Sequence, residues 1–272
     1  MDDYELAHEY ETVNLYRRGG AAKIELNRPE TRNAWNKQFA ADVAAAVQGA
    51  GDDPGVRAVV ITGAGKGFCS GVDLTGGPRD RSDLSQNQRL DDLAWVGRLA
   101  LGVYGLDKPT VAAVNGVAAG AGMSLALACD LRVGGPNARF KVIFLERSLS
   151  AEAGMSYLLP RIIGYSRAAD LLFTSREVRS DEAYRMGLLD RLVDEGEDVV
   201  ERGVELARQM AAMPPLALRS AKRALQHNLD AEFNEALRYE AVTSGWARRA
   251  PNDAQEAIAS FRERRPPRFT GT

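Results

Sequence analysis

The chain has 272 residues, of which 45% are apolar and 26% are charged, a balance typical of a globular domain that can bury a substantial core. Its net charge of −2 provides no overall field for nucleic acid or an acidic membrane surface, and we expect neither partner. The first ten residues are acidic, unlike a secretory signal, and no run approaches the roughly 18 apolar residues that cross a bilayer, so we expect a cytoplasmic protein.

Two kinds of strand are predicted in the first half of the chain. Alternating apolar and polar residues indicate half-buried antiparallel strands over 13–16 and 22–26, joined by a turn at 18–20. Runs of small apolar and β-branched residues indicate strands buried on both faces, at 57–62 and 110–115.

Helices are predicted where apolar residues recur every three or four positions, over 36–49 and 90–106. Residues 76–89 are rich in Gly, Pro, Ser and charged residues, which predicts a mobile loop. Further extended segments are expected at 130–133 and 139–144. The chain then becomes almost wholly helical, with helices predicted at 154–163, 166–173, 180–187, 197–212, 215–227, 230–249 and 252–264. We therefore expect an α/β core over 1–195 and an all-helical region over 196–272.

Two glycine-rich stretches, Gly63–Leu74 and Asn115–Leu125, each follow a predicted buried strand and lead toward a predicted helix. Glycine lets the backbone approach a ligand, and the first turn of a helix offers free N–H groups to an anion. Either stretch alone would be interpreted as an ordinary turn. The pair, about fifty residues apart, is more informative when read with its flanking segments.

Five segments of this chain occur in the order and spacing of the crotonase family, also called the enoyl-CoA hydratase/isomerase family. They are Leu26–Trp35, Ile61–Leu74, Ala113–Gly122, Ala128–Arg132 and Leu159–Gly164. The resemblance covers roughly residues 12–270. It implies a fold in which repeated ββα units spiral around a core, with an all-helical C-terminal extension that builds a homotrimer or a dimer of trimers. It also implies an acyl-CoA substrate, with coenzyme A as part of the thioester and no permanently bound cofactor.

Thioester chemistry at the α-carbon passes through an enolate, whose negative oxygen needs fixed hydrogen-bond donors. The resemblance implies that the backbone amides of Val72 and Ala121 are these donors. Glycine is the usual residue at the Ala121 position, and alanine leaves the amide available if its φ is negative.

The resemblance also implies contacts with coenzyme A. The adenine end is expected at the first glycine-rich stretch, and the phosphates are expected at two arginines, one of which acts across a subunit boundary in many family members. Trp35 lies where an apolar residue packs against the pantetheine arm, although packing in the core is an equal alternative. The expected coenzyme A contacts are Arg32, Ser70, Asp73, Leu74 and Arg264.

The family's hydratases use two glutamates, and the matched positions here hold Ser124 and Phe144. Neither side chain moves a proton as a carboxylate does, so hydration by two glutamates is unsupported. We expect both residues to line the substrate pocket instead.

Glu152 is the predicted proton carrier. It lies eight residues after Phe144, where family members that move double bonds carry an aspartate. The alternative interpretation is an acid at a helix N-terminus that complements the helix dipole. Glu146 is a second candidate, for which a surface ion pair with the adjacent Arg147 is the competing interpretation.

Other chemistries have little support. The two histidines, His8 and His227, are far apart in the sequence, so a Ser/His/Asp triad or a histidine metal site is not expected, and no metal ligand is predicted. Neither glycine-rich stretch has P-loop or dinucleotide-binding spacing. Three hypotheses remain: double-bond isomerisation by Glu152, hydration by Glu152 with a water, and a catalytically silent acyl-CoA-binding protein.

Overall fold

The computed structural model describes residues 4–73, 75 and 85–272. Its larger sheet has seven strands in the order β1-β2-β3-β4-β6-β8-β11. The first three strands pair antiparallel and the others pair parallel. Their bounds are Glu5–Glu9 for β1, Val13–Arg18 for β2, Ala21–Leu26 for β3, Ala58–Gly63 for β4, Thr110–Val114 for β6, Leu131–Gly134 for β8 and Arg191–Leu192 for β11.

A smaller sheet has four short strands in the order β10-β9-β7-β5. They are β5 (Gly67–Cys69), β7 (Val117–Ala119), β9 (Arg139–Lys141) and β10 (Glu177–Arg179). Three times, a parallel strand of the larger sheet is followed in the chain by a strand of the smaller sheet and then by a helix. This order agrees with the repeated ββα units expected from the resemblance.

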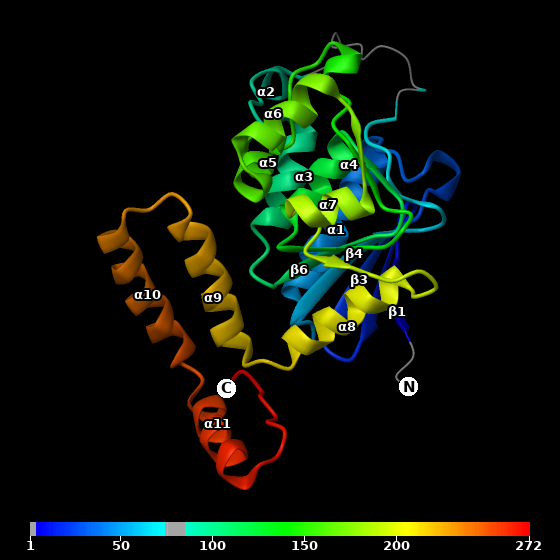
Figure 1. Ribbon diagram of the computed structural model, residues 1–272. Coiled ribbons are helices and arrows are strands. Elements are labelled where there is room, and N and C mark those ends of the chain that lie inside the picture. Colours follow the sequence, from blue (N-terminus) through cyan, green and yellow to red (C-terminus); the bar gives the residue numbers. More distant parts are fainter. Residues whose placement is uncertain (1–3, 74, 76–84) are drawn as a thin grey trace.

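The helices of the first two thirds of the chain lie on one side of the larger sheet, where the first and the fourth of them pack directly against its strands (Figure 1). They are α1 (Lys37–Asp52), α2 (Gln86–Arg89), α3 (Ala94–Tyr104), α4 (Ala121–Ala128), α5 (Met155–Ile163), α6 (Tyr165–Thr174) and α7 (Ser180–Met186), with 3-10 turns η1 (Pro29–Thr31) and η2 (Leu145–Arg147). The Asn36 side chain caps α1 by accepting a hydrogen bond from the Phe39 amide at 2.8 Å.

The central strands β4 and β6 are buried on both faces, as predicted. Val59 and Ile61 point into the core formed with α1, α3, α4 and α5. Ala58 and Val60 point the other way, into a second core closed by α8 (Val199–Ala211). The alternation of side chains along a strand therefore explains why these runs carry apolar residues on both faces.

Three further helices, α9 (Pro215–Asn228), α10 (Phe233–Ala247) and α11 (Pro251–Glu263), form an arm that extends away from the sheets (Figure 1). Buried Lys222 ties α9 to the core, because its ammonium donates to Asp130 at 2.7 Å and to the Lys108 carbonyl at 3.0 Å. By contrast α8, which lies in the predicted helical region, packs on the sheet.

Several local predictions need correction. The first glycine-rich stretch contains the short strand β5, and Phe144 precedes a 3-10 turn rather than ending a strand. Most of the predicted loop at 76–89 lies outside the described residues, and residues 86–89 form α2. In the part of the chain that the structure describes, none of the helices has the length and apolar character needed to cross a membrane.

Candidate functional site

The strands β5 and β7 pair in parallel, so the segments that follow them meet at one edge of the smaller sheet. Gly71 has a φ of 92°, and a Cβ there would lie 2.7 Å from the Ala119 carbonyl oxygen and 3.6 Å from the Ala121 nitrogen. A Cβ at Gly122 would lie 2.2 Å from the Cys69 carbonyl oxygen. Glycine at these two positions therefore allows the two glycine-rich stretches to touch.

The Val72 amide is held in place by its neighbours. Trp35 forms a parallel bridge with Val72, in which the Trp35 amide donates to the Gly71 carbonyl at 2.7 Å and the Asp73 amide donates to the Trp35 carbonyl at 2.8 Å. These bonds use the groups on either side of Val72. The N–H of Val72 itself therefore points away from Trp35.

Ala121 is the first residue of α4, and its φ is negative. A negative φ was the condition under which alanine at this position leaves its amide available, so Ala121 meets it. Amides in the first turn of a helix have no acceptor within the helix, and the helix dipole places partial positive charge there. Because every residue of α4 is buried, this donor is fixed in a rigid, water-poor setting.

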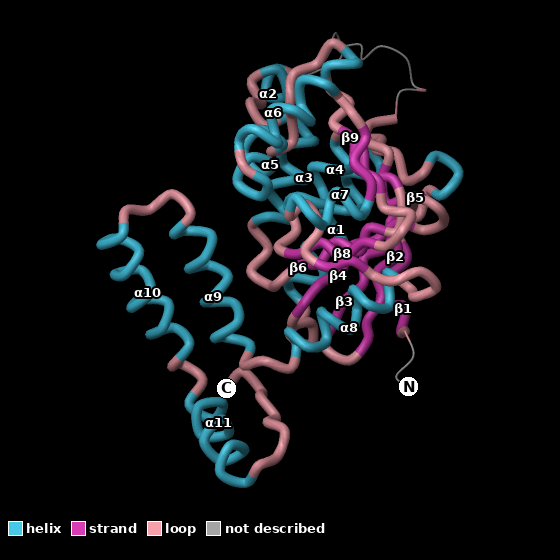
Figure 2. Tube along the Cα trace, in the orientation of Figure 1, coloured by secondary structure: helices cyan, strands magenta, loops and turns pink. Residues whose placement is uncertain are grey.

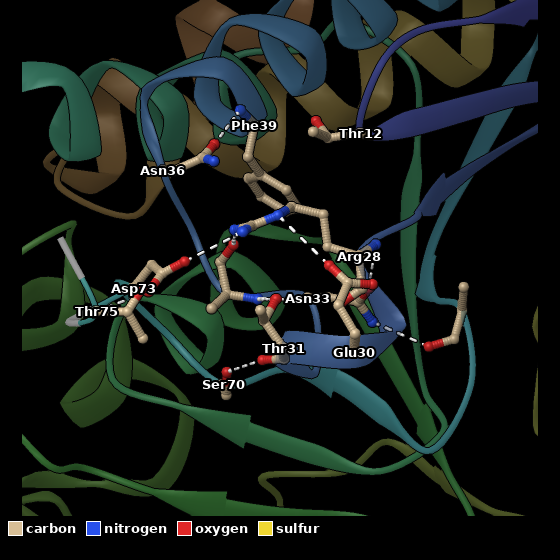
Figure 3. A network of polar contacts seen from close by, with 12 residues as sticks. Thr12, Arg28, Glu30, Thr31, Asn33, Asn36, Phe39, Ser70, Asp73 and Thr75 are labelled. Carbon is tan, nitrogen blue, oxygen red and sulfur yellow. Dashed lines mark hydrogen bonds and ion pairs between the residues drawn. The ribbon is translucent and has the colours of Figure 1, made fainter.

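Two residues that the sequence analysis did not single out brace the first stretch (Figure 3). Asn33 is fully buried with a φ of 58°, and its side-chain amide donates to the Gly67 carbonyl at 2.8 Å and to the Phe68 carbonyl at 3.3 Å. The Arg28 guanidinium pairs with Asp73 at 3.1 Å. The signals for these roles were an Arg-Pro pair and an asparagine, the residue type that most readily replaces glycine at positive φ.

The side chains predicted to contact coenzyme A at the first stretch differ in whether they already have hydrogen-bond partners within the protein. The Ser70 hydroxyl donates to the Thr31 carbonyl at 3.0 Å, and Asp73 accepts hydrogen bonds from Thr75 (Figure 3). The Thr75 hydroxyl is the main reason why the pKa of Asp73 is lowered. Arg32 is exposed, and its guanidinium has no hydrogen bond or ion pair with any residue that the structure describes. Leu74 lies outside the described residues.

Ser124, Phe144 and Glu152 lie around the start of α4. Ser124 is fully buried, and its hydroxyl donates to the Glu152 carbonyl at 3.3 Å. Phe144 is also buried, and its ring lies 4.0 Å from where a Cβ would stand on Gly120. Glu152 is half-buried, and across the described ranges 4–73, 75 and 85–272 its carboxylate has neither a hydrogen bond nor an ion pair.

These positions can be compared with the alternative interpretations of Glu152 and Glu146. Gly154 precedes α5 with a φ of 82°, and the first turn of that helix contains no acidic residue, so Glu152 lies before α5 rather than in its first turn. Glu146 is exposed and forms an ion pair at 2.8 Å, as the competing interpretation expected, but its partner is Lys141 rather than Arg147.

Trp35 and Arg264 are the remaining predicted residues. Trp35 is fully buried in the core, where its ring stacks on Phe39 with centroids 6.0 Å apart and lies 5.9 Å from the ring of Trp95. Arg264 directly follows α11 and is exposed, and its guanidinium has no partner among the described residues. Figure 2 shows α11 far from β5, so Arg264 does not meet the first glycine-rich stretch of its own chain.

Both cysteines are buried, as expected for small apolar residues, and burial raises the pKa of each thiol to about 12. They are therefore protonated at neutral pH. No group of three or more His, Cys, Asp or Glu side chains in the described part of the chain is arranged to hold a metal ion.

This chain is similar to known proteins over nearly its whole length. The enoyl-CoA hydratase/isomerase family model matches residues 17–272. The 1,2-epoxyphenylacetyl-CoA isomerase of Escherichia coli is 31% identical over 93% of this chain and 95% of its own. The crotonyl-CoA hydratase of Syntrophomonas wolfei is 31% identical over 96% of this chain and 98% of its own.

Among solved structures, the enoyl-CoA hydratase of Bacillus anthracis superposes with a TM-score of 0.88 at 28% identity, over 96% of this chain and 100% of its own. That match confirms the expected crotonase-like α/β fold with its C-terminal helices. The chain therefore belongs to the enoyl-CoA hydratase/isomerase family, a family of enzymes that act on acyl-CoA thioesters.

Proposed function

We propose that this enzyme isomerises a carbon–carbon double bond of an acyl-CoA thioester through an enolate, with Glu152 as the proton carrier. The observation that carries the proposal is the place of Glu152. Its backbone is hydrogen-bonded to Ser124 in α4, the helix that begins with the Ala121 amide, and its carboxylate has no partner within the described residues. A carboxylate that no described residue engages supports a role for Glu152 in acting on the substrate.

The reaction needs two kinds of group. The Val72 and Ala121 amides hold the thioester oxygen as it becomes an enolate oxygen, and each such donor lowers the barrier by roughly 3 kcal/mol. Glu152 removes a proton from one carbon and returns it to another, so that the double bond moves and the carboxylate is regenerated. No water is consumed, and one carboxylate suffices.

Isomerisation is favoured over hydration by the residues at the two hydratase positions. The Ser124 hydroxyl is engaged with the Glu152 carbonyl, and Phe144 is apolar and buried. Neither supplies a second carboxylate to hold and activate water. Hydration by Glu152 with a water is the second candidate, supported by relatives named as hydratases, such as that of S. wolfei.

Recognition of coenzyme A is proposed at the first glycine-rich stretch. The Arg32 guanidinium, which has no partner among the described residues, would meet a phosphate through charge-assisted hydrogen bonds. Ser70 and Asp73 would face the adenine end through their backbone groups, because their side chains already have partners. Arg264 of one subunit would reach the phosphates bound by another.

We also propose that residues 196–272 contain the oligomerisation region, within a homotrimer or a dimer of trimers. The arm α9–α11 carries large apolar side chains that are exposed in a single chain, more than an isolated surface helix needs. They include Leu225, Leu229, Phe233, Leu237, Val242, Ile258 and Phe261.

A panel of 2-enoyl- and 3-enoyl-CoA thioesters, incubated in D2O and analysed by mass, tests the proposed reaction. Isomerisation moves the double bond and introduces solvent deuterium without adding water, whereas hydration adds one water. Binding of the thioesters without any deuterium exchange would instead establish the catalytically silent alternative.

A further inference from the structure

We propose that Ser124 is a positioning residue for Glu152. Its buried hydroxyl ties the segment that carries the proton carrier to the helix that carries the Ala121 amide. This inference rests on the proposed function of Glu152, and the experiment below separates the two.

The hydrogen-bond pattern of Ser124 is unusual for a helical serine. Such a hydroxyl commonly donates to the carbonyl one turn earlier in its own helix. Here the Gly120 carbonyl accepts the Ser124 amide at 3.0 Å, and the hydroxyl instead donates to Glu152, 28 residues farther along the chain. Ser124 is fully buried, and a buried hydroxyl without a partner is costly, so this bond satisfies it.

The segment 150–153 has little else to hold it. Within the described residues, the Ser124 bond is its one hydrogen bond from outside residues 150–155. Ala153 and Gly154 adopt left-handed conformations, with φ values of 55° and 82°. A left-handed alanine is strained and persists only where its surroundings hold it. Burial of Ala153 and the Ser124 bond together provide that restraint.

Ser124 and Ala121 are three residues apart on one rigid, buried helix. The donor for the enolate oxygen and the anchor for the proton carrier therefore share a single element. A bound thioester would meet both groups at a fixed separation, which is what efficient proton transfer requires. Loss of the anchor would let the carboxylate drift while leaving the amides in place.

Ser124→Ala removes the hydroxyl at nearly constant volume and suits a helix. Since a misplacement of about 1 Å costs up to ~100-fold in rate, we expect kcat to fall roughly 10- to 100-fold with KM within a few-fold of the parent. Ser150→Ala is the matched control, because Ser150 is exposed in the same segment and has no hydrogen-bond partner among the described residues. That control should retain the parent kcat. Thermal melting of each variant confirms folding.

The double variant with Glu152→Gln distinguishes positioning from a general structural effect. If Ser124 acts through the carboxylate, Ser124→Ala should cause no further loss in the Glu152→Gln background. Equal losses in both backgrounds, or parent kcat in Ser124→Ala, would overturn the inference. Parent turnover in Glu152→Gln alone would instead overturn the proposed function of Glu152.

Discussion

Gly71→Ala tests whether contact between the two glycine-rich stretches positions the Val72 amide. A Cβ at residue 71 would lie 2.7 Å from the Ala119 carbonyl oxygen, closer than a Cβ atom approaches a backbone oxygen in folded proteins. The φ of 92° is also unfavourable for any residue other than glycine. Because the obstacle is backbone rather than a flexible side chain, the ends of β5 and β7 must move apart.

Two costs add in this variant. The positive φ costs about 1–3 kcal/mol, and the overpacked contact costs about 1–3 kcal/mol more, so the free energy of unfolding should fall by about 2–6 kcal/mol. Val72 directly follows the substituted residue. A displaced oxyanion donor lowers kcat by about 100- to 1,000-fold.

Urea unfolding measures the change in the free energy of unfolding, and initial rates with a thioester that the parent enzyme converts measure the change in kcat. Gly102→Ala in α3 is the matched control, since a Cβ there meets no atom within 4 Å. It should raise the free energy of unfolding by about 0.5–1 kcal/mol through helix propensity and leave kcat unchanged. A Gly71→Ala protein with the stability and kcat of the parent would refute the reasoning.

Three further predictions concern binding, pH and assembly. Arg32→Ala should weaken acetyl-CoA binding about 10-fold at low salt, by loss of a charge-assisted contact worth about 1.5 kcal/mol at this exposed position, and less at high salt. Calorimetry showing no change at low salt would contradict this. The hydrogen bond from Thr75 lowers the pKa of Asp73 in the folded protein. The ionised Asp73 therefore stabilises the fold fully above the unfolded pKa of about 3.9, and this stabilisation is lost as pH falls through the lower folded pKa. Asp73→Asn should therefore show a shallower loss of stability than the parent in urea unfolding from pH 5 to 2.5, and parallel curves would count against this. Sedimentation at micromolar concentration should show trimers or hexamers, and Phe233→Glu, which changes an exposed residue of α10, should shift them toward monomers; a monomeric parent would exclude the assembly.

The elements that the sequence predicts well are those with a strong local pattern. β4 and β6 are apolar on both faces because a core lies on each side of the sheet, and the helices from α5 to α11 follow their periodicity to within a few residues. The strands β5 and β7 have three residues each, too few to show any period, and only their parallel pairing defines them.

The site was predicted by resemblance to a family rather than by spacing. No local pattern indicates that Ser124 reaches the Glu152 carbonyl across 28 residues, or that Asn33 donates to carbonyls more than thirty residues away. Both contacts depend on how distant segments pack. Likewise, the partner of Glu146 was predicted from sequence adjacency, whereas the 3-10 turn η2 brings it to Lys141.

Exchange of substrate α- and γ-protons with solvent deuterium, compared between the parent and Glu152→Gln, tests the role of Glu152 most directly. Glutamine preserves size and hydrogen bonding but carries no exchangeable acid proton. We predict exchange and isomerisation by the parent, at least a ~100-fold loss of both in the variant, and thioester affinity within a few-fold of the parent. Unchanged exchange and turnover in Glu152→Gln would contradict the account and direct attention to Glu146.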